Sequence, residues 1–197
     1  MKTFLSATIV CLVISPVFSQ DAVIPSKEVQ IKTAVMAAPE EKQAGAKVLG
    51  YNESGEFVEL RKGTNEMICI ADDPNGKGFS VSCYQAALEP FMERGRELKK
   101  EGKSFQEIFD TREAEAKSKK LKMPNEGATL FVLTSDAENY NTNTGDVSDT
   151  YLRYVVYLPW ATSETTGLPL KPSAPGMPWI MDPGTHRAHI MITPPRD

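Results

Sequence analysis

The sequence predicts an α+β domain with a mostly antiparallel sheet, a central pair of helices and a proline-rich, extended C-terminal segment. Strand-like runs come first in the chain, two helical patterns occupy its middle, and strand-like runs return in its last third. Strands and helices that are segregated along the chain in this way are typical of the α+β class. The chain shows no repeat of the kind that solenoids have, and its size suits one domain, so we expect residues 20–197 to form a single exported domain.

The first 19 residues predict a cleavable signal peptide. Lys2 is the only charge before Asp21, an apolar run follows it, and the small Ser19 precedes the expected cut. The run is too short for a membrane anchor, which needs about 20 apolar residues. Cys11 lies inside the run and not at a lipoprotein cleavage site. We therefore expect a periplasmic or secreted protein with no transmembrane segment in the mature chain.

The charge balance disfavours nucleic acid as a partner. The formal net charge of the chain is −4, and removal of Lys2 with the signal peptide makes the mature domain one unit more negative. One basic cluster follows acidic residues on a predicted helix, and we interpret it as a solvated face at the helix C-terminus. Its members are Lys117, Lys119, Lys120 and Lys122.

The first half of the mature chain predicts one helix and two pairs of strands. Residues 28–38 fit a strand by their alternation and a helix by their alanines, and we favour a helix that ends near Pro39. Residues 47–51 and 57–60 flank a turn and predict a hairpin. Residues 67–71 and 79–83 would extend this hairpin into a meander.

Two cysteines, Cys69 and Cys83, remain after the signal peptide is removed. An even number of cysteines in an oxidising compartment predicts a disulfide. Closing a loop of about 15 residues would stabilise the domain by roughly 3 kcal/mol. A redox or metal pair is the alternative, but the spacing fits neither Cys-x-x-Cys nor a zinc pattern.

The middle of the chain predicts two helices. Gly102 would end the first helix, and Ser104 with Glu107 matches the capping box that begins the second. The expected apolar faces consist of Leu88, Phe91, Met92, Gly95 and Leu98 in the first helix and of Phe105, Ile108 and Phe109 in the second.

The last third predicts three strands, at residues 128–133, 151–158 and 187–193. A polar loop, residues 135–149, joins the first two strands. Eight of the 14 prolines fall between positions 159 and 195, so we expect this connection to be extended and not helical.

The two histidines of the chain suggest a metal site. His186 and His189 follow Asp182, and these side chains could bind a transition metal such as zinc, copper or iron. Residues three apart in a strand point to opposite faces, so a shared metal would need a bend near Thr185. His189 and Met191 could alternatively suit copper. We favour a structural interpretation, with His186 in a turn and His189 half-buried in a strand, because a third ligand is not evident.

Trp160 and Trp179 flank the proline-rich stretch 167–172. Tryptophans beside extended proline segments can line a ligand groove. The alternative is that the indole rings pack over the loop and hold it in place, and we favour this packing role.

Two loops contain oxygen ligands that could suit calcium. In residues 73–78, Lys77 occupies the position of the third ligand. The second loop matches no fixed spacing, and we interpret both as solvated turns. The oxygen donors of the second loop are Asp136, Glu138, Asn141, Asn143, Asp146 and Asp149.

The sequence contains none of the common catalytic motifs. It lacks a Gly-x-Ser-x-Gly elbow, a phosphate-binding glycine loop, a dinucleotide fingerprint and a His-Glu-x-x-His motif. We therefore predict a non-catalytic exported domain that binds a small ligand or an envelope protein along its C-terminal groove. The alternative is a metal-binding protein or metal-dependent enzyme centred on Asp182, His186 and His189.

Four stretches, residues 67–74, 88–92, 166–169 and 178–192, resemble a group of exported bacterial proteins without assigned function. The resemblance would cover most of the mature chain. It implies a location in the bacterial envelope and supplies no activity and no site residues.

Overall fold

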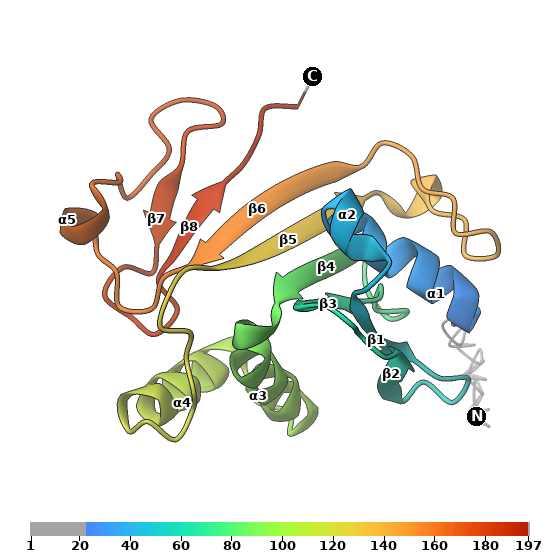
Figure 1. The fold of residues 1–197 in the computed structure, drawn as a ribbon, viewed down its shortest axis with the longest axis horizontal. Helices are drawn as coiled ribbons and strands as arrows, with labels where there is room; N and C mark the ends of the chain where they lie inside the picture. Colours follow the sequence, from blue (N-terminus) through green and yellow to red (C-terminus); the bar gives the residue numbers. More distant parts are fainter. Residues whose placement is uncertain (1–22, 197) are drawn as a thin grey trace, which may run out of the picture.

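A computed structural model describes residues 23–196, so the predicted signal peptide, residues 1–19, lies outside the described residues. The described chain forms one eight-stranded sheet with helices on both faces (Figure 1). The strand order is β2-β1-β3-β4-β5-β6-β8-β7. Only β1 and β3 run parallel, and all other neighbours are antiparallel, which confirms the predicted α+β class with a mostly antiparallel sheet.

The N-terminal helix is confirmed. Ser26 caps α1 (Lys27–Ala34), which continues into the 3-10 turn η1 (Val35–Ala37). Pro39 then precedes the short α2 (Glu40–Gln43). The buried Gln30 side chain donates to the backbone oxygens of Pro25 and Tyr51 and accepts a bond from the Tyr51 N–H, so it attaches α1 to the first strand.

The first four strands are β1 (Lys47–Tyr51), β2 (Phe57–Arg61), β3 (Met67–Ile70) and β4 (Phe79–Gln85). The β1–β2 hairpin is confirmed. The predicted meander is wrong at one point, because β3 pairs with β1 in parallel and leaves β2 at the edge. A local apolar pattern marks a strand but does not specify which neighbour it pairs with.

The predicted disulfide is present. The antiparallel register of β3 and β4 places Cys69 directly opposite Cys83. Their sulfurs are 2.05 Å apart and both residues are fully buried. The cross-link therefore joins two central strands of the sheet.

Both central helices are present. The 3-10 turn η2 (Ala86–Leu88) leads into α3 (Glu89–Lys100), and α4 (Phe105–Lys117) begins with the predicted Ser104–Glu107 capping box. The expected apolar face of the second helix is partly wrong, because the Phe105 side chain is 66% exposed. Arg112 is the residue that this helix buries. The Arg187 guanidinium covers the Phe105 ring at 5.2 Å, which gives this phenylalanine a partner at the surface.

The last third contains the predicted strands β5 (Ala128–Ser135), β6 (Tyr151–Tyr157) and β8 (His189–Ile192). The 3-10 turn η3 (Ala137–Asn139) lies in the polar loop. The proline-rich connection is more regular than expected, since it contains the short helix α5 (Ser163–Thr166) and the edge strand β7 (Trp179–Met181). Thr162 caps α5 and Gly167 ends it, so local capping produced a helix where proline content suggested none.

The sheet has a hydrophobic core on each face. The first core lies under α1 and η1, and the second lies under α3 and the segment that follows α4. The alternation of β4 supplies both, because Val81 and Cys83 face the first core while Tyr84 faces the second. Within residues 23–196, no helix combines the length and apolar character needed to cross a bilayer.

Candidate functional site

The turn between β7 and β8 is attached to the segment that follows β6. The Trp160 N–H donates to Thr185 O at 2.8 Å, and the Gly184 N–H donates to Ala161 O at 2.8 Å. Trp160 and Asp182 both have left-handed backbone conformations, with φ of 70° and 51°. Such conformations cost about 1–3 kcal/mol in residues other than glycine, and they cluster at functional sites. The turn that contains Asp182 and His186, two of the three predicted metal ligands, is therefore strained and is held in place by the segment that follows β6.

His186 is fully buried against α4. Its Nδ1 lies 3.2 Å from Oε2 of Glu113, and the rings of Phe91 and Phe109 pack edge-on against the imidazole. Burial lowers the pKa of His186, and the hydrogen bond to Glu113 opposes this shift only in part. We therefore assign a neutral imidazole whose Nδ1–H donates to the Glu113 carboxylate. Its Nε2 has no hydrogen-bond partner in the described part of the chain.

His189 faces a different partner. Its Nδ1 lies 2.6 Å from Arg187 O, and its ring packs against Tyr157 at 5.1 Å. Burial also lowers the pKa of His189. Its exposed fraction is 3%, so it is more deeply buried than the half-buried position that the strand pattern suggested, and the turn residue His186 is buried as well.

The predicted metal ligands do not converge. Asp182 lies 3.0 Å from Nη1 of Arg187, while His186 faces Glu113 and His189 faces the backbone. Across residues 23–196, no group of three or more histidine, cysteine, aspartate or glutamate side chains is arranged to hold a metal ion. Each predicted ligand thus contacts a different protein partner, and the unpartnered Nε2 of His186 is not joined by the other two predicted ligands.

Sequence reasoning missed Arg112, which is buried beside His186. Its guanidinium lies 3.9 Å from the centre of the Phe91 ring, and Nη1 donates to Phe91 O. Desolvation by burial lowers the pKa of Arg112 to about 10. Gly95 makes room for this packing, because a Cβ at that position would lie 2.8 Å from Nη1 of Arg112. An arginine in a helix usually points to solvent, so the sequence offered no signal for its burial.

An open pocket of about 890 Å³ lies beside the C-terminal end of α4. Two segments that are distant in the sequence form it, namely the α4–β5 connection and Trp160 after β6. We call it the Trp160 pocket. It is lined by Ala116, Lys117, Lys119, Leu121, Lys122, Met123, Asn125 and Trp160.

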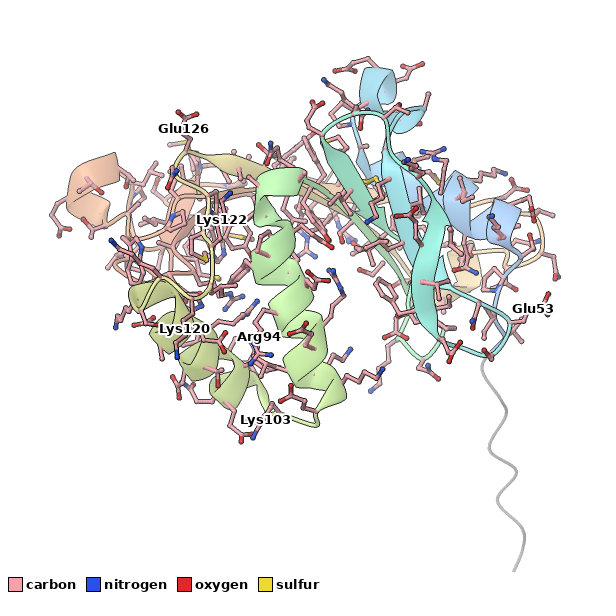
Figure 2. All side chains as sticks on the ribbon, turned by 60° about the horizontal axis from the view of Figure 1, so that its bottom comes forward. Glu53, Arg94, Lys103, Lys120, Lys122 and Glu126 are labelled. Atoms are coloured by element: carbon pink, nitrogen blue, oxygen red, sulfur yellow. A yellow bond between two sulfur atoms is a disulfide. The ribbon has the colours of Figure 1, made fainter. Side chains whose placement is uncertain are left out.

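The lysine cluster is exposed, as predicted, but most of it lies beyond the end of the helix. The helix α4 ends at Lys117, so Lys119, Lys120 and Lys122 belong to the irregular segment that follows. Figure 2 shows Lys120 and Lys122 on this segment beside the helical pair, with Glu126 at its end. The Lys117 Nζ lies 2.5 Å from Glu113 Oε1 and 6.0 Å from the centre of the Trp160 ring, so it connects the pocket to the Glu113–His186 pair.

The two tryptophans do not share one site. Trp160 is 39% exposed and lines the pocket, whereas Trp179 pairs with Met191 in the β7–β8 ladder and is not one of the lining residues. Trp179 therefore does not contribute to the pocket that Trp160 lines, and the packing role of the two indole rings stays a prediction.

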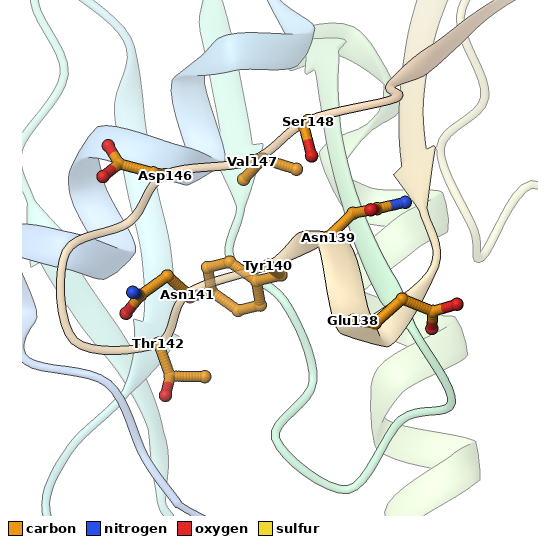
Figure 3. Close-up of a pocket in the computed structure, with 8 residues that line it drawn as sticks. All are labelled: Glu138, Asn139, Tyr140, Asn141, Thr142, Asp146, Val147 and Ser148. Atoms are coloured by element: carbon orange, nitrogen blue, oxygen red, sulfur yellow. The ribbon is translucent and has the colours of Figure 1, made fainter.

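A second pocket, of about 510 Å³, lies in the polar loop between β5 and β6. Figure 3 shows the carboxylates of Glu138 and Asp146 at opposite ends of it, pointing away from each other. Asp146 pairs with Lys32 at 2.9 Å, and the Asn141 side-chain oxygen accepts bonds from the N–H groups of Asn143 and Thr144. Because these oxygens are satisfied within the protein, the loop does not present converging calcium ligands.

Comparison with protein-family models, with curated proteins and with solved structures gives no match to this chain. The resemblance to exported bacterial proteins therefore stays a prediction, and the site must be judged by its geometry.

Proposed function

We propose that the protein is a non-catalytic binding domain that holds a small ligand in the Trp160 pocket. The observation that carries this proposal is the construction of the pocket. Lys119 and Trp160 stand in its two walls, and they are two of the four non-glycine residues with positive φ among residues 23–196. Strain of this kind persists only where the surrounding structure enforces it, and it is often associated with ligand contact.

The lining suits a ligand with an apolar surface. An exposed indole, Leu121 and Met123 offer aromatic and aliphatic contacts, and Asn125 adds a hydrogen-bonding group. Small-molecule sites commonly combine such apolar walls with a few polar groups. Tryptophan provides a large contact area at a low cost in conformational entropy.

The buried histidine supports a binding role and not a catalytic one. The Glu113–His186 pair resembles the orienting half of a catalytic triad, in which a carboxylate holds the imidazole in one tautomer. A general base must lie within hydrogen-bond reach of the proton that it removes. His186 is 0% exposed and enclosed by aromatic rings, so a substrate in the pocket would not reach its Nε2.

We also infer that the domain acts outside the cytoplasm. The buried Cys69–Cys83 disulfide supports this location, because disulfides persist in oxidising compartments. Mass analysis of the exported protein without reductant should show no free thiol at these positions, and two free thiols would refute the inference.

Fluorescence titration with anilinonaphthalene sulfonate tests the ligand proposal. We expect saturable binding by the native domain, and about tenfold weaker binding after Trp160→Leu because stacking on an indole contributes roughly 1–3 kcal/mol. Trp179→Phe is the matched control and should bind as the native protein does. Binding that is unchanged in Trp160→Leu would overturn the proposal.

A further inference from the structure

We propose that the Trp160 pocket selects ligands that join a negatively charged group, such as a carboxylate or sulfonate, to a planar apolar body. This inference rests on the proposed binding function and specifies the chemical class of its ligand. It is carried by the residues that line the pocket, by their charge partners, and by the backbone conformation of one lysine.

The pocket contains two lysines without an acidic partner. Lys117 is engaged with Glu113, whereas neither Lys119 nor Lys122 has a carboxylate within ion-pair distance in the described part of the chain. No acidic side chain lines the pocket. This concentration of positive charge lies on a chain whose net charge is −4, so it is a local feature of the site.

Lys119 occupies a position that normally belongs to glycine. It follows the C-cap residue Ser118 of α4 with φ of 60°, where a side chain costs free energy. Among residues 23–196, the other two helices that end in the left-handed conformation have glycine there, namely Gly102 after α3 and Gly167 after α5. The chain therefore accepts strain at the one helix end that faces the pocket, which is expected if the ammonium group has a function.

The segment that carries the lysines is held in place before any ligand binds. The Lys119 N–H donates to Ala116 O and the Leu121 N–H donates to Glu115 O, so the chain is anchored to the end of α4. The Leu121 side chain is buried in the core beneath the helical pair. A preformed wall loses little entropy on binding and can discriminate by charge.

The apolar part of the lining selects the body of the ligand. The exposed Trp160 ring and the partly buried Met123 line the pocket beside the two lysines, and Leu121 adds only the small part of its side chain that is not buried in the core. A planar hydrocarbon can stack on the indole while its acidic group reaches Lys119 or Lys122. An inorganic anion would use only the lysines, and a neutral aromatic would use only the apolar wall.

A matched pair of fluorescent probes tests this class. Anilinonaphthalene sulfonate and phenylnaphthylamine share the planar body and differ in the sulfonate. We expect the native domain to bind the sulfonate about tenfold more tightly, an advantage that should fall as salt is added. Equal affinities for the two probes would overturn the anion preference, while loss of both in Trp160→Leu would still support the pocket as the binding site.

Lysine variants identify the contacts. Lys119→Gly and Lys122→Gln should each weaken sulfonate binding about threefold, the double variant about tenfold, and none should change binding of the neutral probe by more than about twofold. Lys120→Gln is the matched control, since Lys120 has the same charge and segment but does not line the pocket. A loss in Lys120→Gln equal to that in the pocket variants would refute direct contact.

Lys119→Gly has a second readout that separates function from folding. Glycine relieves the left-handed strain, so the melting temperature should rise by about 2 °C while sulfonate binding weakens. A variant that binds the sulfonate as tightly as the native domain would show that Lys119 does not contact the anion.

Discussion

The two halves of the sheet differ in how completely their buried polar side chains are hydrogen-bonded. Around α1 and strands β1 to β4, the buried polar side chains Gln30 and Thr33 are hydrogen-bonded to nearby backbone, and a disulfide joins the central strands. Around α4 and strands β6 to β8, His186 and Arg112 each keep a buried nitrogen without a partner in the described chain, whereas the unpartnered group beside the first core is a neutral hydroxyl, that of Tyr140. The first half has the features of a region that stabilises the fold. The second half contains buried nitrogens without hydrogen bonds and residues with strained backbone conformations, which is common at binding sites.

The largest expected effect lies in the first half. Replacing both cysteines, Cys69→Ala with Cys83→Ala, should lower the free energy of unfolding by about 3 kcal/mol, because the cross-link limits the unfolded chain. Urea denaturation of the oxidised native protein and of the variant measures this difference. Reduced native protein is the control and should match the variant. An unchanged urea midpoint would show that the disulfide is not what distinguishes this half.

The buried histidines of the second half should make the stability of the folded domain depend on pH. Burial lowers the pKa of both His186 and His189, so the unfolded chain takes up protons that the native protein resists. Stability should therefore fall as the pH drops below about 6.5, the usual histidine value. The pKa of Glu113 is also lowered, chiefly by its bond to Lys117, which would extend the loss to lower pH.

Single histidine variants separate these contributions. His186→Gln and His189→Gln should each flatten the dependence of unfolding free energy on pH between about 7 and 5. Urea titrations at several pH values would measure the slopes. A native domain whose stability does not change across this range would contradict the assignment of neutral buried imidazoles.

Loss of the N-terminal cap of α4, the helix that connects the pocket to His186, should lower stability less than loss of the disulfide does. Ser104→Ala removes the capping box of α4 and should cost about 1 kcal/mol of stability. Thermal denaturation would show the loss, and Ser118→Ala at the other end of the same helix is the control. A cost equal to that of the disulfide variant would mean that α4, and not the disulfide-linked half, determines stability.

The smallest expected effect is that of metal removal. Because Asp182, His186 and His189 each face a different protein partner, we expect treatment with a chelator to leave the melting temperature unchanged. Elemental analysis of the native protein, compared with His186→Ala combined with His189→Ala, provides the direct measurement. Stoichiometric metal that is lost in the double variant would restore the metal-binding alternative.

The sequence predicted most elements of the fold and less of the site. Local signals were sufficient for the Ser104–Glu107 cap, the β1–β2 hairpin and the strands that hold Cys69 and Cys83. Sequence patterns also indicated Trp160 and the lysine cluster as candidate features, and the structure places Trp160 and three of these lysines in the lining of one pocket. They did not predict that β3 crosses to the other side of β1, because pairing between strands depends on the whole sheet.

The sequence by itself determined where helices and strands form and which cysteines can pair, because capping, alternation and residue chemistry act over a few positions. Only the tertiary structure decided that Arg112 is buried, that His186 meets Glu113, and that Lys119 and Trp160 face one pocket. Arg112 packs on Phe91, 21 residues earlier in the chain, and the other contacts join the end of α4 to segments about 40 to 75 residues later. No short pattern can encode such distances, and the candidate binding site exists only where the folded chain brings these segments together.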